Sequence, residues 1–179
     1  MKIQVSVGHS KLKNGAITSA DGTALGGGNE YKFCKEFVQI LKKYLEAAGH
    51  EVTILQVPER LVPDQAAEKR YKIVRYNDNY DLNLELHLNA AGASAKGTEA
   101  LYVSNTGKKY ATAICNKLGE LWTNRGAKKR TNLYFLNTTK APAVLLELFF
   151  CTNKEEWAKA QRNKRKMARL ITEAIASIK

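Results

Sequence analysis

The chain has 179 residues, of which 44% are hydrophobic and 8% aromatic. This length and composition suit one globular domain with a normal core, and they exclude a chain that is disordered throughout. Lysine and arginine outnumber aspartate and glutamate by 29 to 17, and the resulting net charge of +12 predicts an anionic partner such as nucleic acid, anionic lipid or a polyanionic cell wall.

Cysteine content and hydropathy indicate the cellular compartment in which the chain is made. Cys34, Cys115 and Cys151 lie far apart and form no CxxC pair, which argues against a disulfide framework and for synthesis in a reducing cytoplasm. The N-terminal segment turns polar too soon to supply the apolar region of a signal peptide. No apolar run approaches the roughly 20 residues that span a membrane. We therefore expect a protein without a signal peptide or a transmembrane segment.

The first predicted strand covers residues 3–7, where apolar and polar side chains alternate, and it leads into Gly8 and His9. We expect Gly8 to let the backbone turn sharply, so that the His9 imidazole is exposed at the edge of the sheet. A loop of about twenty residues follows, and loops of this length in compact domains are usually functional or disordered. The sequence leaves the path of the 10–28 loop open.

A helix is predicted to begin after Asn29, which is a candidate N-cap, and to end at Gly49. Glu30 then lies in the first helical turn. A carboxylate is common there because the helix dipole favours its ionised form. Taken alone, Glu30 therefore has an ordinary structural explanation.

The segment 81–89 is the one around which the chain is organised. Leucine occupies every even position from 82 to 88 and a polar residue every odd one, a period of two that predicts a strand with a leucine face and a polar face. His87 lies near its end, and the polar face carries no lysine or arginine. The simple alternative is an antiparallel strand with one solvated face.

The remaining predicted elements alternate between strands and helices. The expected strands cover 51–57, 98–103, 133–136 and 143–150, the expected helices begin near Asp64 and Thr106 and cover the C-terminal segment, and 124–132 is expected as a loop. This alternation predicts an α/β fold: a twisted, mostly parallel sheet flanked by helices on both faces, in a single domain over 1–179. In such sheets, sites form beyond the carboxyl ends of the strands.

Glu147 is difficult to explain as a structural residue, because it interrupts the apolar stretch 143–150. A carboxylate in such surroundings costs several kcal/mol to desolvate unless it has a partner or changes its protonation state. One explanation is a buried ion pair with a lysine. The other is that Glu147 opens into a site, where burial and a nearby cation tune it as an acid or base.

Three histidines are present, and two of them end predicted strands. His50 follows a helix C-terminus, where an imidazolium is mildly favourable, and we interpret it as structural. His9 and His87 remain. Two histidines and one carboxylate with an open fourth position form a catalytic zinc arrangement, although no compact HExxH spacing supports it here.

Six blocks, in this order, resemble the zinc-dependent N-acetylmuramoyl-L-alanine amidases, and above all the N-terminal catalytic modules of endolysins from phages of Gram-positive bacteria. The blocks are Gly8-His9-Ser10, Asn29-Glu30, Leu86-His87-Leu88-Asn89-Ala90, Lys96-Gly97-Thr98-Glu99, Asn124-Arg125-Gly126-Ala127-Lys128 and Pro142-Ala143-Val144-Leu145-Leu146-Glu147-Leu148-Phe149-Phe150. The resemblance covers essentially the whole chain. This chain differs from many members of the family directly after the first histidine, where they have glycines and it has Ser10-Lys11.

This resemblance implies one zinc ion per chain, held by His9, Glu30 and His87, and it changes the interpretation of Glu30 from dipole partner to ligand. It implies that the amide between the lactyl group of N-acetylmuramic acid and the L-alanine of the stem peptide is cleaved by zinc-activated water, with Glu147 as general acid/base. Asn89 is a further candidate for contact with substrate.

The implied partner is the peptidoglycan of a Gram-positive wall, and Lys140 is a second candidate contact. No separate wall-binding domain is visible. Either the chain is an isolated catalytic module, or its +12 charge serves as a general anchor for anionic wall polymers. The resemblance also implies release from the host cytoplasm through a membrane lesion.

Two other functions are compatible with the residues. A zinc peptidase that cuts within the stem peptide or cross-bridge would use the same metal chemistry. A basic binding module for wall polymer or nucleic acid would need no metal, but no nucleic-acid motif accompanies the charge.

Overall fold

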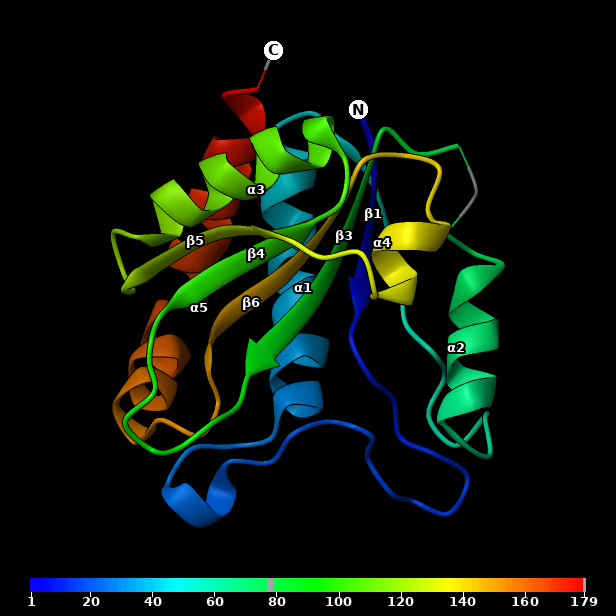
Figure 1. Cartoon of the computed structure of the whole chain (residues 1–179), viewed down its shortest axis with the longest axis vertical. Coiled ribbons are helices and arrows are strands. Elements are labelled where there is room, and N and C mark those ends of the chain that lie inside the picture. Colours follow the sequence, from blue (N-terminus) through cyan, green and yellow to red (C-terminus); the bar gives the residue numbers. More distant parts are fainter. Residues whose placement is uncertain (77–78, 179) are drawn as a thin grey trace.

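A six-stranded sheet forms the centre of the computed structural model, which describes residues 1–76 and 79–178 (Figure 1). Its order is β2-β1-β3-β6-β4-β5, and all neighbouring strands are parallel except β6 and β4. The strands are β1 (Lys2–Val7), β2 (Glu51–Leu55), β3 (Leu82–Asn89), β4 (Thr98–Tyr102), β5 (Asn124–Lys129) and β6 (Ala143–Phe150). The predicted twisted, mostly parallel sheet is confirmed.

Helices cover both faces of this sheet, as predicted (Figure 1). Three long helices pack on one face in the larger core: α1 (Glu30–Ala47), α3 (Asn105–Leu118) and α5 (Lys154–Ala176). Two shorter helices lie on the other face around a smaller core: α2 (Gln65–Ile73) and α4 (Tyr134–Thr138). None of the helices in the described residues has the length and apolar composition needed to cross a membrane.

The two faces of β3 follow the predicted alternation. Leu82, Leu84, Leu86 and Leu88 are buried in the larger core under α1 and α5. The odd positions face the other side, where Asn83 and Glu85 are buried as well. Because β3 has a parallel neighbour on each side and its polar face is covered, the alternative of an antiparallel strand with one solvated face is wrong.

Two elements between α3 and β6 differ from the prediction. The predicted loop 124–132 contains β5, whose polar residues pair with β4 at the edge of the sheet, where only one neighbour is needed. The predicted strand 133–136 lies at the start of α4, a short helix that buries Phe135 and Leu136 in the smaller core. A four-residue apolar segment has too little periodicity to distinguish one helical turn from a strand.

Helix ends agree more closely with the prediction. Asn29 caps α1 by accepting the backbone N–H of Lys32, and Asp64 caps α2 by accepting that of Ala67. Helix α3, predicted to begin near Thr106, begins at Asn105; its cap is Ser104, whose hydroxyl accepts the N–H of Gly107.

Candidate metal centre and active site

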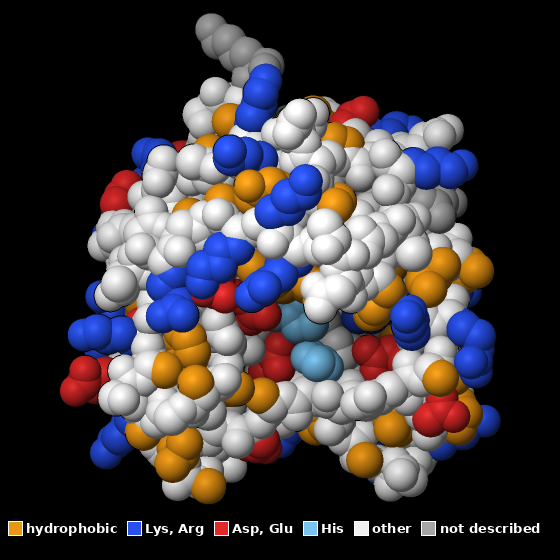
Figure 2. Space-filling view, in the orientation of Figure 1, with side chains coloured by type: hydrophobic (Ala, Val, Ile, Leu, Met, Phe, Trp, Pro, Cys, Tyr) orange, Lys and Arg blue, Asp and Glu red, His pale blue; other side chains and the backbone are white. Residues whose placement is uncertain are grey.

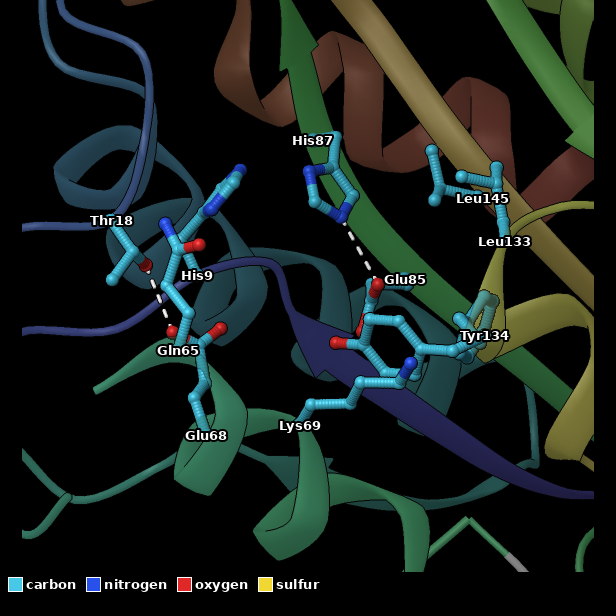
Figure 3. A pocket seen from close by; sticks show the side chains of 11 residues that line it. His9, Thr18, Gln65, Glu68, Lys69, Glu85, His87, Leu133, Tyr134 and Leu145 are labelled. Atoms are coloured by element: carbon cyan, nitrogen blue, oxygen red, sulfur yellow. Dashed lines mark hydrogen bonds and ion pairs between the residues drawn. The ribbon is translucent and has the colours of Figure 1, made fainter. Parts of the chain in front are cut away.

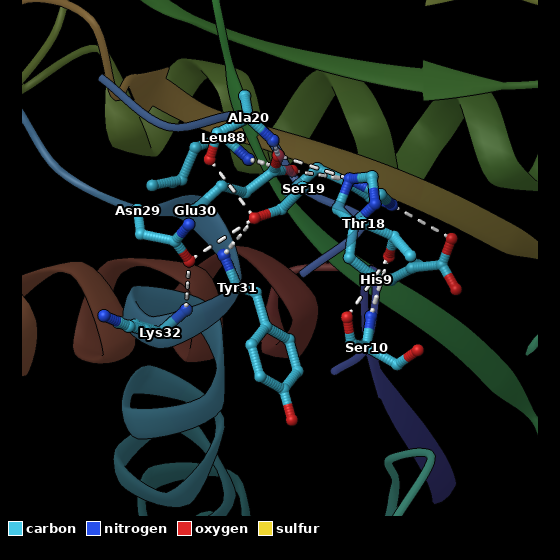
Figure 4. Close-up of polar contacts among 12 residues, drawn as sticks. His9, Ser10, Thr18, Ser19, Ala20, Asn29, Glu30, Tyr31, Lys32 and Leu88 are labelled. Atoms are coloured by element: carbon cyan, nitrogen blue, oxygen red, sulfur yellow. Dashed lines mark hydrogen bonds and ion pairs between the residues drawn. The ribbon is translucent and has the colours of Figure 1, made fainter. Parts of the chain in front are cut away.

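Three segments that are distant in the sequence bring His9, Glu30 and His87 together. His9 lies two residues after the end of β1, Glu30 is the first residue of α1, and His87 lies near the carboxyl end of β3. Each offers a ligand atom, and these atoms all lie within 4.8 Å of one another. The Nε2 atom of His9 is 3.2 Å from Oε2 of Glu30 (Figure 4). The Nδ1 atom of His87 is 2.9 Å from Oε1 of the same carboxylate.

Backbone groups hold the Glu30 carboxylate in this position. The N–H of Ala20 donates to Oε2 and that of Leu88 donates to Oε1, each at 3.1 Å. Burial alone would raise the pKa of Glu30, but hydrogen bonds and attraction from the two imidazoles outweigh burial and hold this pKa well below its usual range. Glu30 is therefore an ionised carboxylate between two histidines.

The loop 10–28, whose path the sequence left open, returns to this carboxylate. Isolated bridges join Lys11 to Ile17 and Asp21 to Asn29, and a short 3-10 helix, η1 (Thr23–Leu25), lies near its end. The loop thus places the backbone N–H of Ala20 within hydrogen-bond distance of the Glu30 carboxylate. Its function in this structure is to support the carboxylate side of the three-residue group.

Gly8 has a different role from the predicted turn. The left-handed conformation falls on His9, with φ of 63°, whereas a Cβ atom on Gly8 would lie only 2.4 Å from Cε1 of His87. The missing side chain therefore makes room for the imidazole of the neighbouring strand.

We expect Gly8→Ala to displace His87, because the added methyl group overlaps the ring. Overpacking of this kind typically costs about 1–3 kcal/mol of unfolding free energy. Chemical denaturation measures this cost, and Gly92→Ala is the control, since a Cβ there meets nothing within 4 Å. Equal stability of the two variants would contradict the close packing of Gly8 on His87.

His87 is held from both sides, and its second partner escaped the sequence analysis. Its Nε2 atom is 3.1 Å from Oε1 of Glu85, which lies two residues earlier on the same face of β3 (Figure 3). Burial disfavours the charged imidazole, but hydrogen bonds to Glu30 and Glu85 raise the pKa of His87 to about 10. The period-two pattern placed Glu85 on the polar face, and that was the one signal available.

Glu147 lies directly beside His87, because these two residues are partners in the register of β3 and β6. The side chain makes no ion pair with a lysine or arginine in the described part of the chain, and its buried Oε2 atom has no hydrogen-bond partner there. Burial raises the pKa of Glu147 to about 7; the charge of His87 lowers it, and Glu30, Glu99 and Glu85 raise it further. The ion-pair explanation of Glu147 is therefore not supported.

A pH-dependent stability follows from this carboxylate. Its pKa rises from 4.5 to about 7 on folding, so the folded state keeps a proton that the unfolded state releases between these values. Burial of the charge then costs up to about 3 kcal/mol above pH 7 and little below pH 4.5. We expect metal-free Glu147→Gln to be more stable than the wild type at pH 8, with the difference shrinking towards pH 5. Denaturation in a chelator measures this, and a difference independent of pH would contradict it.

A cavity of about 290 Å³ adjoins the histidines on the side of α2 and α4. Leu133, Phe135 and Leu145 supply apolar walls, while polar groups come from the loop and from α2 (Figure 3). In the space-filling view, histidine side chains lie in a hollow flanked by acidic side chains, with lysine and arginine side chains gathered above it (Figure 2). The site thus combines a polar centre with an apolar pocket.

Basic side chains lie on the far side of Glu147. Glu99 is the register partner of Glu147 in the antiparallel pair of β4 and β6, so both side chains share a face. Oε2 of Glu99 accepts from Nε of Arg125 at 2.9 Å and from Nζ of Lys128 at 2.6 Å. This arrangement holds two cations of β5 against Glu99 of β4, the strand that lies between β5 and Glu147.

The two candidate substrate contacts are placed differently. Asn89 ends β3, two residues beyond His87, and is partly exposed near the histidines. Lys140 is exposed and precedes β6 at its amino end, whereas Glu147 lies four residues into that strand from Ala143. At about 3.3 Å per residue, that separation alone is on the order of 13 Å, so the structure does not bring Lys140 to the histidines.

His50 keeps its structural interpretation but not as an imidazolium. Both ring nitrogens are buried without a hydrogen-bond partner among the described residues. Burial lowers the pKa of His50, with a further contribution from the charged N-terminus.

Comparison with known proteins identifies the family of the chain. A family model described as N-acetylmuramoyl-L-alanine amidase matches residues 3–177. The chain therefore belongs to the N-acetylmuramoyl-L-alanine amidase family, a class of hydrolases.

Individual relatives extend the comparison. Probable autolysin PH of Staphylococcus aureus is 30% identical over 97% of this chain, and an uncharacterized protein of Clostridium perfringens is 31% identical over 98%. The chain spans only 38% and 51% of these two relatives. The solved catalytic domain of the CD27L endolysin, which targets Clostridium difficile, is 47% identical with a TM-score of 0.94, over 98% of this chain and 97% of that one.

Proposed function

We propose that this domain hydrolyses the amide between the lactyl group of N-acetylmuramic acid and the L-alanine of the stem peptide in peptidoglycan, with one zinc ion held by His9, Glu30 and His87. The observation that carries the proposal is the position of Glu147. In the described residues this carboxylate forms no ion pair with a lysine or arginine and its Oε2 atom has no hydrogen-bond partner, and it lies beside a group of three potential metal ligands.

The three side chains fit a zinc ion. Two imidazoles and one carboxylate form a donor set found in catalytic zinc sites, and their ligand atoms converge within 4.8 Å. Hydrogen bonds from Ala20 and Leu88 hold the carboxylate, so the group is arranged before a metal binds. A zinc ion held by these residues would lower the pKa of a water molecule and polarise the lactyl carbonyl.

Glu147 performs the proton transfers in this proposal. With a pKa near 7, its carboxylate can accept a proton from the attacking water and then donate it to the amide nitrogen. The carbonyl carbon gains the hydroxyl oxygen, the carbon–nitrogen bond breaks, and the alanine leaves as a free amine. The same residue thus serves as base in the first step and as acid in the second.

The surroundings of Glu147 and the three ligands would position the substrate. The apolar walls of the cavity suit the methyl-bearing lactyl and alanyl groups. Asn89, partly exposed at the end of β3 two residues beyond His87, is the candidate for a hydrogen bond to substrate. The net charge of +12 favours approach to anionic wall polymers, an attraction that salt should weaken. The likeness to an endolysin catalytic domain supports a Gram-positive wall as the target and phage-encoded lysis as its setting.

End-group analysis of Gram-positive walls digested with the zinc-loaded protein tests this function. We expect new N-terminal L-alanine, no new reducing sugar ends, and loss of activity in a chelator. New amino ends at other residues would assign the domain to peptidases of the stem or cross-bridge instead. Wall binding without any new ends would leave only a binding module.

A further inference from the structure

A chain of buried polar side chains runs from His87 into the protein. Glu85 is its first member and is only 2% exposed. Oε1 of Glu85 contacts Nε2 of His87 at 3.1 Å, on the edge of the ring opposite the nitrogen that faces Glu30. Oε2 of Glu85 accepts from the hydroxyl groups of Tyr76 at 2.7 Å and Ser6 at 3.0 Å.

Lys72 continues this chain from α2. Its side chain is fully buried, and its Nζ atom lies 3.3 Å from Oε2 of Glu85 and 3.8 Å from Oε1 of Glu68. A buried ammonium between two carboxylates joins the strand that carries His87 to the helix above it. Both carboxylates are at least nine-tenths buried.

Glu68 carries the chain on to the other histidine. Its Oε2 atom accepts from the hydroxyl group of Ser10 at 2.8 Å. It also accepts from the hydroxyl group of Thr18 at 2.9 Å (Figure 3). Ser10 directly follows His9, and its backbone N–H donates to Oγ1 of Thr18 at 3.0 Å (Figure 4). His9 has a φ of 63°, in the left-handed region that non-glycine residues seldom adopt.

Stability alone does not account for this arrangement. Burying charged groups is costly, and well-packed apolar residues often serve stability as well as a buried ion pair does. Here the charged groups reach both histidines. Glu85 contacts the ring of His87 directly, and Glu68 is hydrogen-bonded to Ser10, the residue after His9. Ligating histidines in metal sites commonly donate their second ring nitrogen to such a carboxylate.

We propose that Glu85, Lys72 and Glu68 form a positioning chain that orients both histidines for metal binding, with Glu85 fixing the ring of His87 and Glu68 fixing the backbone turn at His9. This inference rests on the proposed metal site. It adds three residues that act on metal binding through the histidines and are not themselves ligands.

The zinc affinity of Glu85→Gln tests the first half of the chain. The amide keeps the size of the side chain but removes the charge that pairs with Lys72 and His87. We expect the zinc dissociation constant, measured by competition with a chromogenic chelator, to rise about 10- to 100-fold. The melting temperature of the metal-free protein is recorded in parallel.

Asn83→Ala is the matched control for this variant. Asn83 is fully buried on the same face of the same strand, and its side chain donates to the Tyr76 carbonyl without contacting a histidine. We expect it to lower the melting temperature but to leave zinc affinity within about twofold. If both variants weaken zinc binding in proportion to their loss of stability, Glu85 is merely structural and the proposal fails.

Glu68→Gln tests the second half of the positioning chain, from Glu68 to His9. Tyr76→Phe is a milder change at Glu85 and is used if Glu85→Gln does not fold. We expect Glu68→Gln to raise the zinc dissociation constant several-fold, and to be non-additive with Glu85→Gln because Lys72 links the two. Tyr76→Phe removes one hydrogen bond from Glu85 but keeps its charge, and a rise of severalfold is expected there too. Unchanged zinc affinity in Glu68→Gln, or in both variants at Glu85 and Tyr76, would overturn the proposal.

Failure of this inference is distinguishable from failure of the proposed function. A wild-type protein that binds no zinc would remove the metal site itself. A wild-type protein that binds zinc tightly, together with Glu85 and Glu68 variants that bind it equally well, would keep the metal site and reject the positioning chain.

Discussion

Glu147→Gln is expected to lose about 10²- to 10⁴-fold of amide hydrolysis while retaining zinc, because this range is typical for a general acid–base residue. The amide side chain fills the same space but cannot accept the proton of water or deliver one to the leaving nitrogen. The lost factor is expected in kcat, measured on a soluble muramoyl-peptide, with zinc content determined on the same sample.

A matched control separates the loss of proton transfer at Glu147 from the general loss of one negative charge. Glu46→Gln removes a carboxylate that is paired with Lys42 on the exposed end of α1, and it should leave kcat unchanged. Full activity in zinc-loaded Glu147→Gln would exclude the acid–base role and would require another proton carrier near His87.

His87→Gln is expected to abolish tight zinc binding and to destabilise the metal-free protein as well. His87 lies between Glu30 and Glu85, two buried carboxylates that lose their shared partner when the imidazole is removed. Removing one member of a buried ion pair typically costs about 3–5 kcal/mol of unfolding free energy. Zinc content and denaturation in a chelator measure the two effects independently.

His50→Gln is the control for this variant, since His50 lies away from the site and forms no hydrogen bond through its ring in the described residues. We expect it to bind one zinc ion per chain and to keep nearly all of its stability. If His87→Gln also retained one tightly bound zinc, the assignment of His87 as a ligand would be wrong.

How far the fold could be predicted depends on whether each signal is local. The leucine alternation of 82–88 is a property of consecutive residues, so it identified both β3 and the face that carries His87. The caps at Asn29 and Asp64 are local as well. The edge strand β5 is not: its polar residues form a strand because β4 offers one row of hydrogen bonds, which the segment itself does not reveal.

The site shows the same division. Residue type and strand ends drew attention to His9, His87 and Glu147, but the inclusion of Glu30 depended on family resemblance, because a first-turn carboxylate has a simpler explanation. Glu85, Lys72 and Glu68 were missed. Which of the many lysines is buried between two carboxylates depends on how α2 packs on β3, and no spacing along the chain encodes that contact.

Hydrolysis of a purified muropeptide in ¹⁸O-labelled water, followed by mass spectrometry of both products, tests the central claim most directly. Cleavage of the lactyl–alanine amide predicts one ¹⁸O in the lactyl carboxylate and an unlabelled peptide with a free L-alanine amine. The same reaction is expected to be about 10²- to 10⁴-fold slower in Glu147→Gln and absent in the chelated protein. Label in a carboxylate within the peptide would show that another bond is cut and would contradict the account.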